Sequence, residues 1–212
     1  MNWNDWLLAH EPAVRLTFFV GVFVLVALFE IAAPRRALTV SKMMRWGNNI
    51  SLVVFNTVLL RLLFPAAAVG MAAFAAERGW GLLNYVELPF WVATLVAVVA
   101  LDFVIWLQHV MVHAIPVLWR LHRVHHADPD DDVTTGARFH PIEIILSMLI
   151  KFATIAVLGP PVVAVILFEV LLNATAMFNH GNVRLPEAVD RVLRLDRKST
   201  RLNSSPESPS RM

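Results

Sequence analysis

The chain has 212 residues, of which 58% are hydrophobic and 16% are charged, and its formal net charge at pH 7 is +2. Ordinary soluble domains contain about 45–50% apolar and about 25% charged residues, so the composition excludes that class. The absence of cysteine excludes disulfides and thiolate metal sites, and the nearly balanced charge gives no support for a nucleic-acid partner.

Several apolar stretches are long enough to cross a bilayer, which takes about 20 residues as a helix. In chain order they are residues 16–33, 50–76 and 88–113. Residues 142–179 are too long for one crossing, and Gly159-Pro160-Pro161 divides them into a helical hairpin. The first half of that hairpin is short enough to dip into the membrane without spanning it. We therefore predict an all-α integral membrane helical bundle of three spans plus this broken hairpin.

The positions of the basic residues predict how the bundle is oriented, because short cytoplasmic loops carry the excess of Lys and Arg. Arg35, Arg36, Lys42 and Arg45 follow the first span, and Arg120 and Arg123 follow the third. Both segments are expected inside, with the N-terminus outside. We expect a multi-pass membrane protein with this orientation.

Seven of the eight histidines lie between residues 109 and 180. His109 and His113 are four residues apart, which places them on one face of a helix. They are followed by His122, His125 and His126, in the pattern His-x-x-His-His. The alternative, that these are solvated or hydrogen-bonded side chains at the membrane interface, must account for five imidazoles within residues 109–126 of an apolar protein. Metal binding explains them better, since neutral imidazole suits iron, zinc, copper or nickel, and this number of histidines suggests two metals.

The remaining candidates are less distinctive by themselves. His140 precedes Pro141, and His180 ends the hairpin. Asp102 lies two helical turns before His109, and Glu169 lies three turns before His180 on the same face, so both could accept hydrogen bonds from imidazole N–H groups. We interpret residues 128–132, four of which are aspartates, as a solvated loop rather than a cation site.

The order of these motifs resembles the histidine boxes of the fatty acid hydroxylase and sterol desaturase superfamily, in particular bacterial sterol desaturase-type proteins. The similarity covers roughly residues 40–195. Its successive boxes are His109-x-x-x-His113, His122-Arg-Val-His125-His126, Arg138-Phe-His140-Pro-Ile-Glu143 and Phe178-Asn-His180-Gly-Asn182.

This resemblance implies a centre of two iron ions that uses O₂ to hydroxylate or desaturate a lipid C–H bond. The partners it implies are a membrane lipid, O₂ and an unidentified electron donor. By the same resemblance His140 would lie beside the site, where Asp102 and Glu169 are expected on their chemistry as partners of imidazole N–H groups. The metal ligands it implies are His109, His113, His122, His125, His126 and His180.

Two other classes of function stay open. A metal-binding or cation-transport protein could line a path with Asp102, Glu169 and the histidines, but transporters place such groups near mid-membrane on broken helices. The histidines gather at one face of the predicted bundle, which favours the enzyme. A catalytically inactive relative that binds only lipid is the third possibility.

The character of the sequence changes after Leu195. Residues 196–205 resemble the translation of a sequencing-library adapter, and the family's further His-x-x-His-His box is missing. We therefore expect residues 1–195 to be an incomplete hydroxylase-like domain, and residues 196–212 to be a foreign, disordered, adapter-like tail. We also expect the 212-residue product to bind metal poorly and to be inactive.

Ligand counting leads to the same expectation, which can be tested on the source DNA. Two irons open to O₂ need on the order of eight protein ligands in an all-imidazole site, whereas this chain offers at most seven candidates. Re-sequencing the locus should reveal natural coding sequence after Leu195, with another His-x-x-His-His within some tens of codons. A gene that encodes residues 196–212 and then stops would favour the inactive relative instead.

Overall fold

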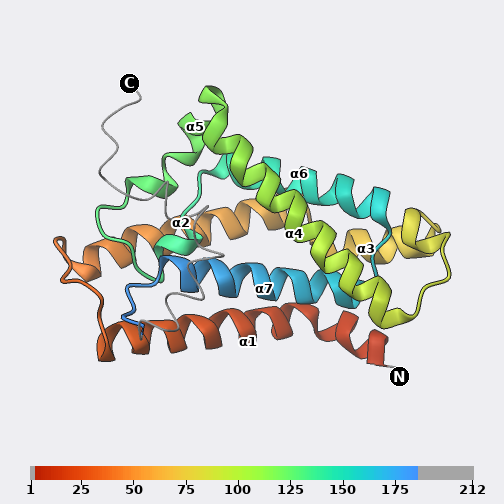
Figure 1. The fold of residues 1–212 in the computed structure, drawn as a ribbon, viewed down its shortest axis with the longest axis horizontal. Coiled ribbons are helices and arrows are strands. Elements are labelled where there is room, and N and C mark those ends of the chain that lie inside the picture. The colour runs from red at the N-terminus through yellow and green to blue at the C-terminus, as the bar shows by residue number, and fades with distance from the viewer. Residues whose placement is uncertain (1–2, 186–212) are drawn as a thin grey trace.

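The computed structural model describes residues 3–185, which form helices joined by short connections (Figure 1). Among these residues the only β-type pairing is an isolated bridge between Pro34 and Val183. Three short 3₁₀ turns, η1 (Leu82–Asn84), η2 (His125–Ala127) and η3 (Thr135–Ala137), accompany the longer helices. These are α1 (Trp3–Ala32), α2 (Lys42–Leu63), α3 (Ala67–Glu77), α4 (Phe90–Ala114), α5 (Pro116–His122), α6 (Pro141–Leu158) and α7 (Val162–His180).

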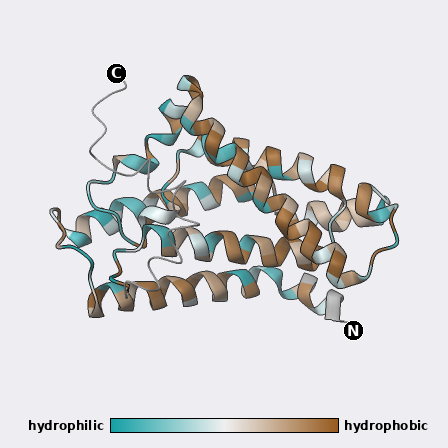
Figure 2. Cartoon of the chain, viewed as in Figure 1, coloured by the Kyte–Doolittle hydropathy of each residue, from teal (hydrophilic) through white to brown (hydrophobic). Residues whose placement is uncertain are grey.

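Five of the helical segments are long and apolar enough to cross a membrane, which confirms the predicted membrane bundle. Their outer faces expose large apolar side chains, among them Leu28, Leu62 and Val157 at 60%, 74% and 65%. Apolar surface of this extent marks a membrane-facing protein rather than a soluble one. Figure 2 shows hydrophobic residues along the helices and hydrophilic ones concentrated at the end of the bundle where α1 finishes and α2 starts.

The predicted second span differs from the structure. Residues 50–76 were expected as one helix, but α2 begins at Lys42 and ends at Leu63, and α3 follows after a break. Pro65 causes the break, because proline lacks an N–H and disfavours the helical conformation of the residue before it. Phe64 accordingly has φ −132° and ψ 72°.

The α6–α7 hairpin forms at the predicted break and runs to the end of the bundle opposite the histidines. Gly159 ends α6 in the left-handed conformation, with φ +64° and ψ +50°, which glycine adopts at little cost. The turn packs against the connection between α3 and α4 so closely that a Cβ on Gly81 would overlap the backbone nitrogen of Gly159. The first half, α6, is among the helices long and apolar enough to cross a membrane.

Helix α7 is at the centre of the bundle. It packs against α1, α3 and α4, as Figure 1 shows for α1 and α4 on either side of it. Phe168 of α7 is buried in the same apolar cluster as Leu101 of α4 and Ile155 of α6. Small residues of α3, including Ala68 and Ala72, are fully buried there and permit close approach of the helices.

The two segments predicted to be cytoplasmic lie at the same end of the bundle. The backbone N–H groups of Thr39 and Val40 donate to Asp130 at 2.7 and 2.9 Å, which joins the α1–α2 connection to the loop after the histidines. Arg78 follows α3, near the turn of the hairpin at the opposite end (Figure 1).

This arrangement makes the predicted orientation testable with fused reporters. Alkaline phosphatase, which is active only outside the cytoplasm, should be active when fused after Arg78 and inactive when fused after Arg36. Green fluorescent protein should give the opposite pattern. A phosphatase that is inactive after Arg78 would reverse the predicted topology.

Candidate metal centre

The six histidines predicted as ligands come from four segments that meet at one end of the bundle. His109 and His113 lie in the last turns of α4, and α5 carries His122. Ile115 is extended between these helices and precedes Pro116 at the first position of α5, so the chain turns and restarts there. η2 contributes His125 and His126, and His180 is the last residue of α7.

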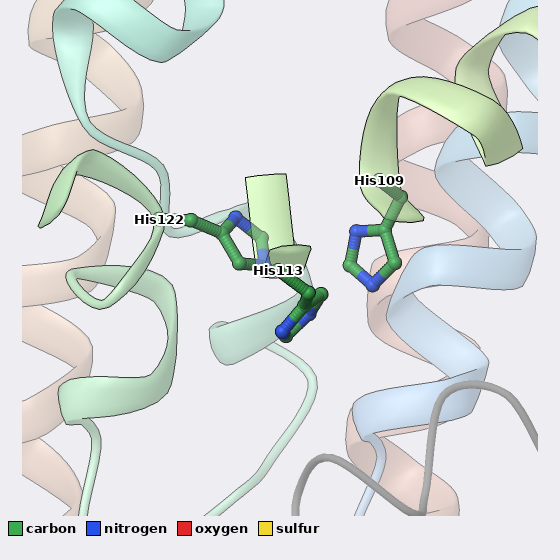
Figure 3. A group of neighbouring side chains, drawn as sticks. All are labelled: His109, His113 and His122. Carbon is green, nitrogen blue, oxygen red and sulfur yellow. The ribbon is translucent and has the colours of Figure 1, made fainter. Parts of the chain in front are cut away.

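His109, His113 and His122 form the first group of rings. Their ring centroids lie 4.7 to 4.9 Å apart, and one nitrogen of each lies within 4.8 Å of the others. Figure 3 shows the three rings gathered around one space. This geometry can hold a metal ion.

The other three rings continue the same cluster. The His126 ring lies 5.0 Å from both His113 and His122, and the His125 ring lies 5.1 Å from His126. His180 reaches His125, with the two Nε2 atoms 3.1 Å apart. The predicted convergence of the six imidazoles is confirmed, while their role as ligands stays a prediction.

Hydrogen bonds fix which nitrogen of two rings faces the cluster. His122 Nδ1 lies 2.6 Å from Glu143 Oε1, and His125 Nδ1 lies 3.0 Å from the carbonyl oxygen of Arg138. A carboxylate or a carbonyl only accepts, so Nδ1 donates in both rings and Nε2 carries the lone pair. In metal-binding histidines, an acceptor that bonds the nitrogen facing away from the metal orients the ring in this way.

Several Nε2 atoms of the cluster are buried without any hydrogen-bond partner. They belong to His113, His122 and His126. A buried polar atom left unpaired costs about 1–3 kcal/mol, so three in one cluster require an explanation. Bound metal would give such nitrogens a partner, and His113 and His122 belong to the group whose ligand atoms lie close enough to hold an ion, so the residues present fit a metal centre.

The rings of η2 are held in the form that binds metals. Burial, together with the neighbouring rings of His122 and His113, lowers the pKa of His126 to about 3. Burial and the nearby His180 ring also place the pKa of His125 well below its usual value. Both imidazoles are consequently neutral at pH 7, as metal ligation requires.

Glu143 is a site residue to which the sequence analysis assigned no role. It is the third residue of α6 and is buried at 5% exposure against His122. The available signal was a single acid in the first turn of a helix that has no other charged residue before Lys151.

The residues predicted beside the site have different positions. His140 is the N-cap of α6, where its Nδ1 accepts from the N–H of Ile142 at 3.1 Å. Asp102 is exposed on α4, and its role as a partner stays a prediction. Glu169 pairs with Lys151 and Arg15, both at 3.2 Å, so its contacts are with cations of α6 and α1 rather than with an imidazole.

The interpretation of residues 128–132 as a solvated loop is wrong for three of its four acids. Asp128, Asp130 and Asp132 are buried at 8%, 1% and 1% exposure. The reason is Arg45 of α2, which is itself buried and pairs with Asp128 and Asp132. Burial opposes ionisation of Asp128, but hydrogen bonds from Arg45, Asn49 and Thr135 outweigh it and lower the pKa of this carboxyl.

Comparison with known proteins gives one match. A family model described as fatty acid hydroxylase matches residues 94–202, a range that includes all six histidines of the cluster. No curated protein and no solved structure matches the chain. The matched range overlaps the first residues of the segment 196–212 interpreted as foreign, which lies outside the described residues.

The contact between Glu143 and His122 predicts a measurable effect on metal binding. Glu143→Leu should weaken Co²⁺ binding by about 10–100-fold, because the His122 ring loses the acceptor that orients it. Glu143→Gln should have a smaller effect, since it keeps an acceptor oxygen. Titration of each variant with Co²⁺ measures this, with Glu77→Leu, an exposed acid of α3, as control. Equal affinities for Glu143→Leu and Glu77→Leu would contradict the assignment.

Proposed function

The chain belongs to the fatty acid hydroxylase family, and on that premise we propose that it is a membrane di-iron oxygenase that hydroxylates or desaturates a lipid C–H bond with O₂. One observation carries the proposal. Six imidazoles from four segments converge, and three of their buried Nε2 atoms have no protein partner. No ordinary packing role explains unpaired nitrogens that face one another.

The donor atoms decide which chemistry fits. The proposed ligands are all nitrogen donors, which suits iron and excludes thiolate-bound metals. When bound, two irons would supply the redox chemistry with O₂ that no amino-acid side chain provides. The residues that would hold them are His109, His113, His122, His125, His126 and His180.

The surrounding side chains orient the rings and limit water. Glu143 and the Arg138 carbonyl keep the Nδ1 protons of His122 and His125 away from the cluster. The Phe139 ring stacks on His125 at 4.7 Å with an interplanar angle of 4°. Trp119 lies 5.3 Å from His113. These aromatic rings cover the imidazoles with apolar surface.

The position of the cluster supports a lipid substrate. It lies where α4 ends, and exposed apolar residues such as Met111, Ile115 and Val117 continue the membrane-facing surface beside it. An acyl or sterol-like chain in the bilayer could approach the histidines from this surface. We further propose that the cluster faces the cytoplasm of the bacterial inner membrane and receives electrons from an unidentified donor.

The cation-transport alternative is less well supported. The charged groups inside the bundle, Arg15, Lys151, Glu11 and Glu169, pair with one another. They lie on α1, α6 and α7, and Glu169 is three turns away from His180. Paired charges of this kind do not form an open path toward the histidines.

The proposal is tested by metal content and lipid oxidation together. A complete version of the protein, with natural coding sequence after Leu195, should bind about two irons and oxidise a membrane lipid in an O₂-dependent reaction, and His125→Ala should abolish both the metal binding and the lipid oxidation. Membrane insertion should not change, because the apolar helices are untouched. His10→Ala is the matched control, since His10 is exposed near the start of α1 and its Nδ1 lies 2.8 Å from the backbone carbonyl oxygen of Trp6.

Three results would redirect the proposal. Zinc as the only metal, with an activity that does not need O₂, would indicate a hydrolase or transporter. Iron binding without lipid oxidation would favour the inactive relative. Iron retained in His125→Ala would contradict the ligand assignment.

A further inference from the structure

Helix α2 is largely apolar, yet the residues that it buries are polar. Arg45, Asn49 and Asn56 are separated by four and seven residues, so they share one side of the helix. All three are buried at 4% exposure or less. The neighbouring Asn48 is exposed on the other side. Polar groups within a span are costly and usually mark function.

The first two of these residues hold the start of the loop that follows the histidines. Arg45 Nε and Nη2 donate to the two carboxylate oxygens of Asp128 at 2.6 and 3.0 Å. Asn49 Nδ2 donates to Asp128 and to Thr134, both at 2.8 Å. Asn49 also accepts from Arg138 Nη1 at 3.0 Å. One amide therefore joins both halves of this loop.

The third residue holds the end of the same loop. Asn56 Nδ2 donates to the backbone carbonyl oxygen of Phe139 at 2.9 Å. Phe139 is the residue whose ring stacks on His125, and the preceding carbonyl, that of Arg138, accepts from His125 Nδ1. Two of the hydrogen bonds of α2 thus reach Arg138 and Phe139, both of which contact His125.

We propose that Arg45, Asn49 and Asn56 are positioning residues that set the place and orientation of the His125 ring. They act through Asp128, Arg138 and Phe139, without touching His125 themselves. The inference rests on the proposed function, because it takes His125 as a metal ligand. It also extends the site to α2, which precedes the residues matched by the family model.

The test measures the exposure of each histidine in the metal-free chain. Diethyl pyrocarbonate modifies neutral imidazoles, and peptide mass spectrometry gives a rate for each one. His125, 2% exposed, should be protected in the unchanged chain. Asn49→Leu and Asn56→Leu should raise its rate about tenfold or more, because the loop that covers it opens more often once a buried hydrogen bond is lost. Asn48→Leu, the matched control, should leave the rate unchanged.

A purely structural role predicts a different pattern. His113 on α4 should keep its rate in Asn49→Leu if the effect is confined to the loop, whereas general loosening would raise both histidines together and overturn the inference. The inference would also be overturned if His125 were modified in Asn49→Leu and Asn56→Leu at the same rate as in the Asn48→Leu control. If Asn49→Leu does not fold, Asn56→Ala, which removes one hydrogen bond, decides by the same criterion.

Co²⁺ titration separates this inference from the proposed function. If the unchanged chain binds Co²⁺, Asn49→Leu and Asn56→Leu should weaken that binding about tenfold or more, and unchanged affinity would contradict their role. If the unchanged chain fails to bind Co²⁺, the metal-centre proposal fails, while the modification rates still decide whether α2 positions His125.

Discussion

Arg45 and Asp128 meet inside the protein, 2.6 Å apart, with the carboxylate side chain fully shielded and the guanidinium 4% exposed. Removing one partner of such a pair costs about 3–5 kcal/mol, because the other charge stays buried and uncompensated. The pair joins α2 to the residue that directly follows η2. Through Asn49, Thr135 and Arg138 the same carboxylate orders the loop that covers His125. This connection therefore holds the loop that follows the histidine cluster.

Glu30 makes a second connection of the same kind. Its Oε1 accepts from the backbone N–H groups of Val133 and Asn182 at 2.7 and 2.9 Å, and Lys42 lies 3.4 Å from its other oxygen. The end of α1 is thereby bonded to the loop before η3 and to the residues after His180. These backbone groups need partners because they are buried, and one carboxylate supplies two of them. Both ends of the histidine region are thus fixed to helices that carry none of the clustered histidines.

Charges elsewhere in the bundle have a simpler explanation. Arg15 and Lys151 approach Glu169 from α1 and α6, and Glu11 pairs with Arg15 at 2.6 Å. The two positive and two negative charges cancel, which lowers the high cost of burying charged groups within the membrane. This group connects three helices far from the histidines. These four charges thus form a balanced group within the spans, separate from the extended network at the end where the metal centre is proposed.

The sequence by itself determined the bundle of apolar helices, the break at Gly159-Pro160-Pro161, and the shared face of His109 and His113, because these depend on composition and on spacing along one helix. Tertiary structure alone decided the buried state of Asp128 and the pairing of Glu143 with His122. It also placed Asn56 against Phe139. The partners of these side chains are 83, 21 and 83 residues away in the chain. Local periodicity says nothing about contacts at such separations, which form only when the packed helices bring their ends together.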